Sequence, residues 1–466
     1  MIVRTRFEPA PTGSLHVGHA LAAAFNWLYA RKHNGAFVLR FADTDRERTV
    51  EGGAEHALGD LDWLGLGWDE GPFKQSERIP LYQEAVEKLL ASGNAYRCFC
   101  TPEELDARRK QALKEGRPPG YDGRCRNLSE AQAREFQAEG RTPAVRFKMP
   151  AGSTTTTDLV RGEITFEHTS SDDVVIMRAD GWPLYGLAAP YDDLTMKITH
   201  VLRGEDIFPN TARQIRLIEA LGGEPPAYGH FPLLVGADRA KLSKRHGATA
   251  VREYRDMGFL PEVMINYLAI LDWSVGDGMT ERFTIEQLIS SFEPSGITRN
   301  PSAFDLQKLT AFNGERIREL AVDDFVARAE PYLRDIMYER ATLLRIVPLV
   351  QERVHRLDEV PGQVRFLFED AEPDEKAAAL IGRAQHHLGA ALDVLEGLGD
   401  WTSGAINASL MAWADGAGIK RKEAFQPLRA AVTGSLVSPP LFESLEILGR
   451  EKTLQRVRRA IGVAGG

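Results

Sequence analysis

Residues 2–41 read IVRTRFEPAPTGSLHVGHALAAAFNWLYARKHNGAFVLRF, and the fold can be built outward from them. The short apolar runs at 2–7 and 36–41 favour two strands. Between them a helix is expected from about His16, and the Asn-Gly pair at 34–35 supplies its C-terminal stop. A strand–helix–strand opening is typical of a parallel α/β sheet.

The pattern changes twice further along the chain. Between about residues 80 and 180 it predicts an α+β insertion, and α/β character returns from residue 181. In the insertion we expect helices at 102–115 and 129–138 and strands at 143–149, 163–168 and 173–178. From about residue 311 onward helices are expected almost exclusively.

Composition limits the class of protein. The 466 residues, 43% hydrophobic and 26% charged, exclude wholesale disorder and suggest about three domains. A net charge of −9 excludes a uniformly basic nucleic-acid coat but leaves room for local basic patches. Three cysteines exclude a disulfide scaffold, and no signal peptide or long apolar run stands out. We therefore expect a soluble cytoplasmic protein with no membrane partner.

A first candidate site is PTGSLHVGH at residues 11–19, on the turn from strand to helix. His16 and His19 would share one helix face, at a helix N-terminus that suits a phosphate. Gly18 has no Cβ, so a flat base can lie against the helix backbone there. Taken alone, the pattern equally fits two surface histidines on an ordinary amphipathic helix.

A second candidate is KLSKR at residues 241–245. Lys241, Lys244 and Arg245 lie close to Gly247, so this segment would form a mobile cationic loop able to close on a triphosphate. Taken alone, such a cluster is more often a solvated surface loop.

Together the two motifs resemble the two signatures of class I aminoacyl-tRNA synthetases, and nearly the whole chain resembles the bacterial glutamyl-tRNA synthetases. The further matching stretches are LRFADTDRER, WLGLGWDEGP, QSERIPLYQEA, YDGRCRN, ADGWPLYGLA, VLRGEDI, HFPLL and QPLRAAVTGSLVSPPLFESLEILG. The resemblance implies a Rossmann-like α/β catalytic domain with an α+β insertion, followed by all-α anticodon-binding domains. It places the catalytic domain at 1–80 plus 181–240, an acceptor-stem-binding insertion at 81–180, a loop and stem-contact region at 241–310, and helical anticodon-binding domains at 311–380 and 381–466.

The implied reaction has two steps. Glutamate and ATP give glutamyl-adenylate and pyrophosphate, and the 3′ end of tRNA(Glu) then takes the glutamyl group, with activation dependent on bound tRNA. Positioning and electrostatic stabilisation would supply the catalysis, with Mg²⁺ on the ATP phosphates and a monomeric enzyme. The implied catalytic residues are His16, His19, Lys241 and Lys244. The implied ATP site adds Thr12, Gly13, Gly18, Ser243 and Arg245.

The amino-acid pocket departs from the family pattern. The resemblance implies that Arg6 pairs with the substrate side-chain carboxylate and that Tyr185 and Arg203 line the pocket. Departures from the usual residues are Glu8 in place of alanine, Ala10 in place of serine and Ala42 in place of glutamate. Our hypothesis is a charge swap in which Glu8 holds the substrate ammonium; in the alternative, Glu8 points to solvent and the pocket binds glutamate weakly or takes another amino acid.

The cysteines mark a second departure. Cys98, Cys100 and Cys125 lie where many relatives bind structural zinc, but the usual histidine ligand is replaced by Asn127. Three thiolates with Tyr121 or water in the fourth place would still hold zinc. The alternative is three plain thiols.

Two further interpretations are weaker. Asp43 and Asp45 favour a structural role over a metal site, and Arg353 matches loosely an arginine that reads the third anticodon base.

The competing functions are a form that also charges tRNA(Gln), a paralogue for another amino acid, a small-molecule nucleotidyltransferase and a non-catalytic tRNA-binding module. The helical C-terminal part argues against the nucleotidyltransferase, and the intact histidines and lysines argue against the non-catalytic module.

Overall fold

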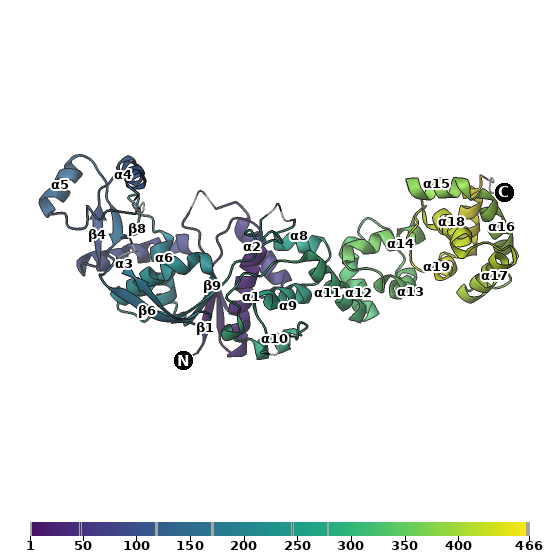
Figure 1. The fold of residues 1–466 in the computed structure, drawn as a ribbon, viewed down its shortest axis with the longest axis horizontal. Coiled ribbons are helices and arrows are strands. Elements are labelled where there is room, and N and C mark those ends of the chain that lie inside the picture. The colour runs from purple at the N-terminus through teal and green to yellow at the C-terminus, as the bar shows by residue number, and fades with distance from the viewer. Residues whose placement is uncertain are drawn as a thin grey trace. The chain divides into compact units, whose positions relative to one another are not determined.

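The structure is a computed structural model that describes residues 2–45, 47, 49–116, 120–168, 172–243, 245, 247–276 and 279–462. Its chain divides into two compact units. Unit 1 comprises Met1–Arg255 and Pro261–Asp305, and unit 2 comprises Asp256–Leu260 and Leu306–Gly466. Figure 1 colours most of unit 1 from purple to teal and most of unit 2 from green to yellow.

Unit 1 is built on parallel strands. The strands β1 (Arg4–Phe7), β2 (Ala36–Phe41) and β3 (Glu70–Lys74) form one sheet in that order. A second parallel pair joins β9 (His200–Gly204) to β10 (Ala227–Phe231), and the Thr199 amide donates to the Arg4 carbonyl at 2.9 Å. The expected parallel α/β opening is therefore confirmed.

Helix α1 (Val17–Lys32) joins β1 to β2 and is buried along much of its surface. A helix that is apolar nearly all round belongs in a core rather than on a surface. After its C-cap the chain turns through Asn34, whose φ is +49°, and Gly35. A Cβ on Gly35 would lie 2.2 Å from the Val3 carbonyl oxygen, so only glycine lets β2 begin beside β1 here.

The insertion contains a three-stranded antiparallel sheet in the order β4-β5-β8 and the β6–β7 hairpin. Its elements are α3 (Ile79–Ala91), β4 (Ala95–Cys98), α4 (Pro102–Lys114), α5 (Glu130–Ala138), β5 (Ala144–Phe147), β6 (Ser153–Asp158), β7 (Gly162–Glu167) and β8 (Val175–Met177). The expected helices are confirmed to within one residue at each end. Thr101 and Ser129 form capping boxes that fix where they begin. Strands β5 and β8 are shorter than expected, and β3, β4 and β10 were not predicted as strands.

The remaining helices of unit 1 pack around these sheets. They are α2 (Gly53–Trp63), α6 (Tyr185–Thr195), α7 (Thr211–Ala220), α8 (Val251–Asp256), α9 (Pro261–Asp272) and α10 (Ile285–Ser291), with 3₁₀ turns at Gln75–Arg78 and Glu205–Asn210. Buried residues of the insertion, such as Tyr82 and Phe147, share one core with Leu187 of α6 and Leu217 of α7. The insertion is thus packed into unit 1.

Unit 2 is helical, as expected. Its helices are α11 (Leu306–Glu319), α12 (Val322–Ala329), α13 (Arg340–Gln351), α14 (Val360–Phe368), α15 (Glu375–Arg383), α16 (Gln385–Glu396), α17 (Ser403–Gly416), α18 (Arg421–Thr433), α19 (Leu441–Leu448) and α20 (Arg450–Ala460). No helix among the described residues has both the length and the apolar character needed to cross a membrane.

Candidate active site

A cleft of about 910 Å³ opens where the parallel strands of unit 1 end. Ligands of open α/β sheets bind at the carboxyl ends of the strands, so this is the expected place for a site. The residues singled out from the sequence that line it are Arg6, Glu8, Ala10, Thr12, His16, Gly18, His19, Ala42, Tyr185, Arg203, Lys241 and Ser243. Gly13 and Arg245 are not among the lining residues, and Lys244 falls outside the described residues.

The HVGH turn is held by its own first histidine. His16 is the N-cap of α1, and its Nδ1 accepts from the Gly18 amide at 3.1 Å. From α2, Asp60 fixes the preceding loop, because its Oδ2 accepts from the Ser14 hydroxyl at 2.6 Å and the Leu15 amide at 2.7 Å. The helix N-terminus is therefore fixed beside the cleft, where its partial positive charge suits a phosphate.

The two sequence motifs meet at this cleft. The Val17 amide donates to the Thr249 carbonyl at 2.9 Å, and the Val251 amide donates to the Leu15 carbonyl at 2.8 Å. These bonds join the HVGH turn to the segment just after KLSKR. Burial is the main cause that lowers the pKa of both His16 and His19, and the positive charge of Lys241 acts in the same direction. Both imidazoles are therefore neutral near pH 7.

Gly18 presents an open surface to the cleft. A Cβ there would meet only the His16 Nδ1, at an ordinary contact distance of 3.5 Å. Gly53 differs, because a Cβ there would lie 2.3 Å from the Pro11 carbonyl oxygen. Gly53 is thus required by the fold, whereas the space above Gly18 is left for a ligand.

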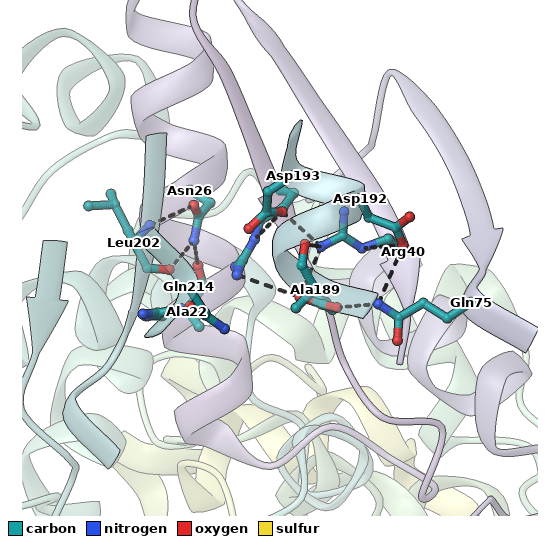
Figure 2. A network of polar contacts seen from close by, with 12 residues as sticks. Ala22, Asn26, Arg40, Gln75, Ala189, Asp192, Asp193, Leu202 and Gln214 are labelled. Carbon is teal, nitrogen blue, oxygen red and sulfur yellow. Dashed lines mark hydrogen bonds and ion pairs between the residues drawn. The ribbon is translucent and has the colours of Figure 1, made fainter. Parts of the chain in front are cut away.

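A buried ionic network around Arg40 adjoins Arg6 and Glu8, which line the cleft (Figure 2). Arg40 is fully buried, with its Nη2 2.8 Å from Asp193 Oδ1 and its Nε 3.5 Å from Asp192 Oδ2. Arg6 lies beside it, 3.4 Å from the same Asp193 oxygen. Burial alone would lower the pKa of Arg6, but the charges of Asp193 and Glu8 raise it above its usual value. Arg6 is thus a permanent cation at the cleft wall.

Glu8 belongs to this network. Its side chain is 3% exposed, its Oε2 lies 3.0 Å from Arg40 Nη2 and 3.5 Å from Arg6 Nη2, and its Oε1 accepts from Gln75 Nε2 at 2.7 Å. The alternative that Glu8 points to solvent is therefore wrong. Among the described residues, Oε2 receives no hydrogen bond despite its two ionic neighbours.

Arg203 is the third buried arginine of the cleft and differs from the other two. Its guanidinium donates to His230, Gln214 and Thr211, and it lies 4.7 Å from the centre of the Tyr228 ring. No carboxylate of the described chain lies within ion-pairing distance of it. Arg203 is thus a buried cation held by neutral acceptors.

The three cysteines come together as expected for a metal site. Their sulfur atoms lie within 4.8 Å of one another, with Cys100 and Cys125 3.6 Å apart. The Tyr121 hydroxyl lies 3.4 Å from Cys98 Sγ and 3.9 Å from Cys100 Sγ, whereas Asn127 is exposed. In tetrahedral zinc, sulfur ligands at about 2.3 Å stand about 3.8 Å apart, so these donors fit. Hydrogen bonds from Cys125 and Tyr121 lower the pKa of Cys98 to about 4, which favours a thiolate.

The structure also describes Asp43 and Arg353, the other residues singled out from the sequence. Asp43 accepts from the Ser76 amide at 2.8 Å and the Ser76 hydroxyl at 2.6 Å, which is a structural role. Arg353 is exposed in unit 2, close enough for its charge, together with burial, to lower the pKa of Arg429. Arg429 belongs to one of the stretches that match the resembled family.

Sequence reasoning missed several residues of the site. Arg40, Asp192 and Asp193 were not singled out, nor were the pair Asp158 and His230 behind Arg203. An arginine inside the apolar strand AFVLRF was a usable signal, because a charge in a buried strand needs partners. The partners themselves could not be read from the sequence, since Asp193 lies 153 residues away from Arg40.

Comparisons with known proteins agree with this geometry. Residues 2–311 match the catalytic-domain model of the class I tRNA synthetases (E and Q), and residues 324–461 match an anticodon binding domain. A glutamate–tRNA ligase of Streptomyces coelicolor is 43% identical, covering 98% of this chain and 97% of its own. One from Geobacter sulfurreducens is also 43% identical, with 98% of each chain covered. A crystal structure of a glutamate tRNA ligase from Elizabethkingia meningosepticum in complex with its amino acid aligns with a TM-score of 0.86 at 29% identity, covering 99% of both chains.

Proposed function

The chain belongs to the class I tRNA synthetases for glutamate and glutamine. From this premise we propose a catalytic or binding role for each group of residues in its cleft. It is a glutamate–tRNA ligase, which activates L-glutamate with ATP and transfers the glutamyl group to tRNA(Glu). The observation that carries this conclusion is the similarity to such ligases over nearly the whole chain. The finer assignments below rest on the geometry of the cleft.

The catalytic groups of the proposal are His16, His19, Lys241 and Lys244. When a glutamate carboxylate oxygen attacks the α-phosphorus of ATP, negative charge grows on the phosphate oxygens and pyrophosphate leaves. The neutral imidazoles at the start of α1 can donate N–H groups to these oxygens, and the lysines can neutralise the leaving group. Removing one such contact typically costs about 10²–10³ in rate.

The ATP site comprises the first turn of α1 and the loop that faces it. Thr12, Gly13 and Gly18 would lie against the nucleotide, with Ser243 and Arg245 on the side of the KLSKR loop. Enzymes of this family use ATP with Mg²⁺, whose role here is to offset phosphate charge. The open surface of Gly18 supports the placement of the base.

The glutamate site is proposed at the other end of the cleft. Arg6 and Arg203 are its two cations, Tyr185 adds a hydroxyl, and the small side chains of Ala10 and Ala42 leave room. Glu8 would accept the substrate ammonium on Oε2. That oxygen is covered by its neighbours, so the carboxylate must rotate toward the cleft to do so.

The cysteine cluster is proposed as a structural zinc site. Cys98, Cys100 and Cys125 would supply three ligands and Tyr121 the fourth, in place of the histidine replaced by Asn127. Zinc held in this way would lock the segment 98–125 to the start of the insertion and would take no part in the reaction.

Different segments of the chain are proposed to bind different regions of the tRNA. The insertion at 81–180 would bind the acceptor stem, 241–310 the inner stem, and the helical parts 311–380 and 381–466 the anticodon, where Arg353 would read one base. A monomer in the cytoplasm is the proposed state, and glutamate activation is proposed to require bound tRNA.

Charging of two purified transcripts tests the proposal. The enzyme should attach glutamate to tRNA(Glu) with ATP, and tRNA(Gln) should be charged at least about 100-fold more slowly, since each lost base contact costs about 1–3 kcal/mol. Equal charging of both transcripts would make it a misacylating form. Charging of neither transcript with glutamate would overturn the proposal.

A further inference from the structure

The neighbours of Arg203 differ in charge from those of the other buried arginines. Its Nε donates to His230 Nε2 at 2.9 Å, its Nη1 to Gln214 Oε1 at 2.6 Å and its Nη2 to Thr211 Oγ1 at 2.8 Å. None of these acceptors is a carboxylate. Arg6 and Arg40, in contrast, lie against Glu8 and Asp193.

A buried arginine without a direct ion pair is costly, and the attraction between Arg203 and Asp193 that lowers the pKa of Asp193 acts beyond ion-pairing distance. Arg203 is 5% exposed and lines the cleft. Three of its five N–H groups are used by neutral acceptors, and its charge is not cancelled at ion-pairing distance by the described residues. It is therefore oriented by its surroundings and still able to pair with a ligand carboxylate.

His230 can accept a hydrogen bond from Arg203 only as a neutral imidazole in one tautomer. It lies directly opposite Arg203 in the β9–β10 register, so both side chains share one face of the sheet. Its Nε2 accepts from Arg203 Nε and lies 3.1 Å from the Thr211 hydroxyl, so the ring proton must be on Nδ1. That Nδ1 lies 2.6 Å from Asp158 Oδ2.

Asp158 is anchored in turn at the end of β6. Its Oδ1 accepts from the amides of Val160 and Arg161, both at 2.9 Å, and from the His230 amide at 3.2 Å. An ionised carboxylate fixed in this way accepts the Nδ1 proton of His230 and excludes the other tautomer.

We propose that His230, Thr211 and Gln214 form a neutral cradle that positions Arg203 for a carboxylate of the substrate, and that Asp158 maintains the cradle by fixing the tautomer of His230. This inference rests on the proposed glutamate site. The four are positioning residues, since they act through Arg203. The neutrality of His230, Thr211 and Gln214 matters as much as their hydrogen bonds, because a charged acceptor in contact with Arg203 would take the place of the substrate carboxylate.

Gln214 offers an isosteric test. Its Nε2 is buried and has no acceptor among the described residues, so Gln214→Glu removes no hydrogen bond and adds a carboxylate beside Arg203. The new ion pair should leave the melting temperature equal to or above the wild-type value. It should also raise KM for glutamate about 10- to 100-fold, as expected for losing a hydrogen-bonded charge pair, with KM for ATP unchanged.

Two matched variants separate charge from packing. His230→Gln keeps a neutral acceptor near Arg203 and should leave KM for glutamate within about fivefold of wild type, whereas His230→Leu removes the acceptor and should raise it about tenfold or more. All are measured by charging tRNA(Glu) at saturating ATP, with melting curves for each.

The outcomes are distinct. A Gln214→Glu enzyme that melts no lower than wild type and has an unchanged KM for glutamate would overturn the cradle, as would equal KM values for His230→Gln and His230→Leu. If Gln214→Glu melts lower than wild type, the two His230 variants decide. Failure of the wild-type enzyme to charge glutamate would instead overturn the proposed function.

Discussion

Gly18 makes the sharpest single-residue prediction. Because a Cβ there meets only His16 Nδ1 at 3.5 Å, Gly18→Ala should fold normally, and the better helix propensity of alanine adds up to about 1 kcal/mol of stability. The added methyl occupies the space proposed for the base, so KM for ATP should rise at least about tenfold while KM for glutamate is unchanged. Charging kinetics and a melting curve check both halves. An unchanged KM for ATP would place the nucleotide elsewhere.

Glu8 tests the charge swap. Glu8→Ala leaves Arg6 and Arg40 short of one buried partner and should cost about 1–3 kcal/mol of stability. Glu8→Gln keeps the shape and can still accept from Gln75, so it should cost less. If the carboxylate holds the substrate ammonium, both variants raise KM for glutamate about tenfold or more, because both remove the charge. Unchanged glutamate affinity in both variants would reject the swap.

The protonation of His230 predicts a pH dependence. Burial and the charges of Arg203 and Arg161 lower its pKa despite Asp158, and Arg161 itself pairs with Glu205. Since the pKa lies below the usual value of 6.5, the acceptor is intact at neutral pH and is lost only in acid. KM for glutamate should therefore stay constant around neutral pH and rise only on the acid side of the usual histidine pKa, and His230→Gln should flatten this rise. Matching profiles for both enzymes would assign the acid effect to another group.

At the scale of elements, the segment between β4 and α5 carries the metal prediction. Purified protein should contain about one zinc per chain, since four N, O or S donors complete a tetrahedral site. Tyr121→Phe removes the fourth donor and should weaken zinc retention against a chelator about 10- to 100-fold. Asn127→Ala is the matched control, because Asn127 is exposed and lies outside the cluster. If protein purified without chelator contained no zinc, the zinc proposal would be rejected and the three cysteines would be plain thiols.

Elements with strong local signals were predictable. Strand β2 occupies 36–41 as expected, because a run of six residues of which five are apolar, preceded by turn residues, favours a buried strand. Helices α4 and α5 were predicted to within one residue, and the capping boxes at Thr101 and Ser129 account for where they begin. The threonine run at 154–157 fits a loop and an edge strand equally, because it carries no alternation of apolar and polar residues, and the structure places it in β6. Its pairing with β7 is set by tertiary structure.

At the scale of the whole molecule, the motifs identified the family and thereby the fold class. Of the residues taken from the two motifs, His16, Gly18, His19, Lys241 and Ser243 line one cavity. Gly13 and Arg245 are outside its lining, and Lys244 is outside the described residues. The supporting shell was not predictable, because Arg40 with Asp193, and His230 with Asp158, join residues far apart in the chain. Such pairs depend on which strands become neighbours, and one sequence does not reveal that.

The central claim is that this cleft activates glutamate. ATP–pyrophosphate exchange tests it most directly, with glutamate, glutamine and aspartate supplied in turn, each with and without total bacterial tRNA. We predict exchange with glutamate when tRNA is present, which would show that a pocket containing Glu8, Ala10 and Ala42 holds this substrate. Exchange with another amino acid and none with glutamate would contradict the account.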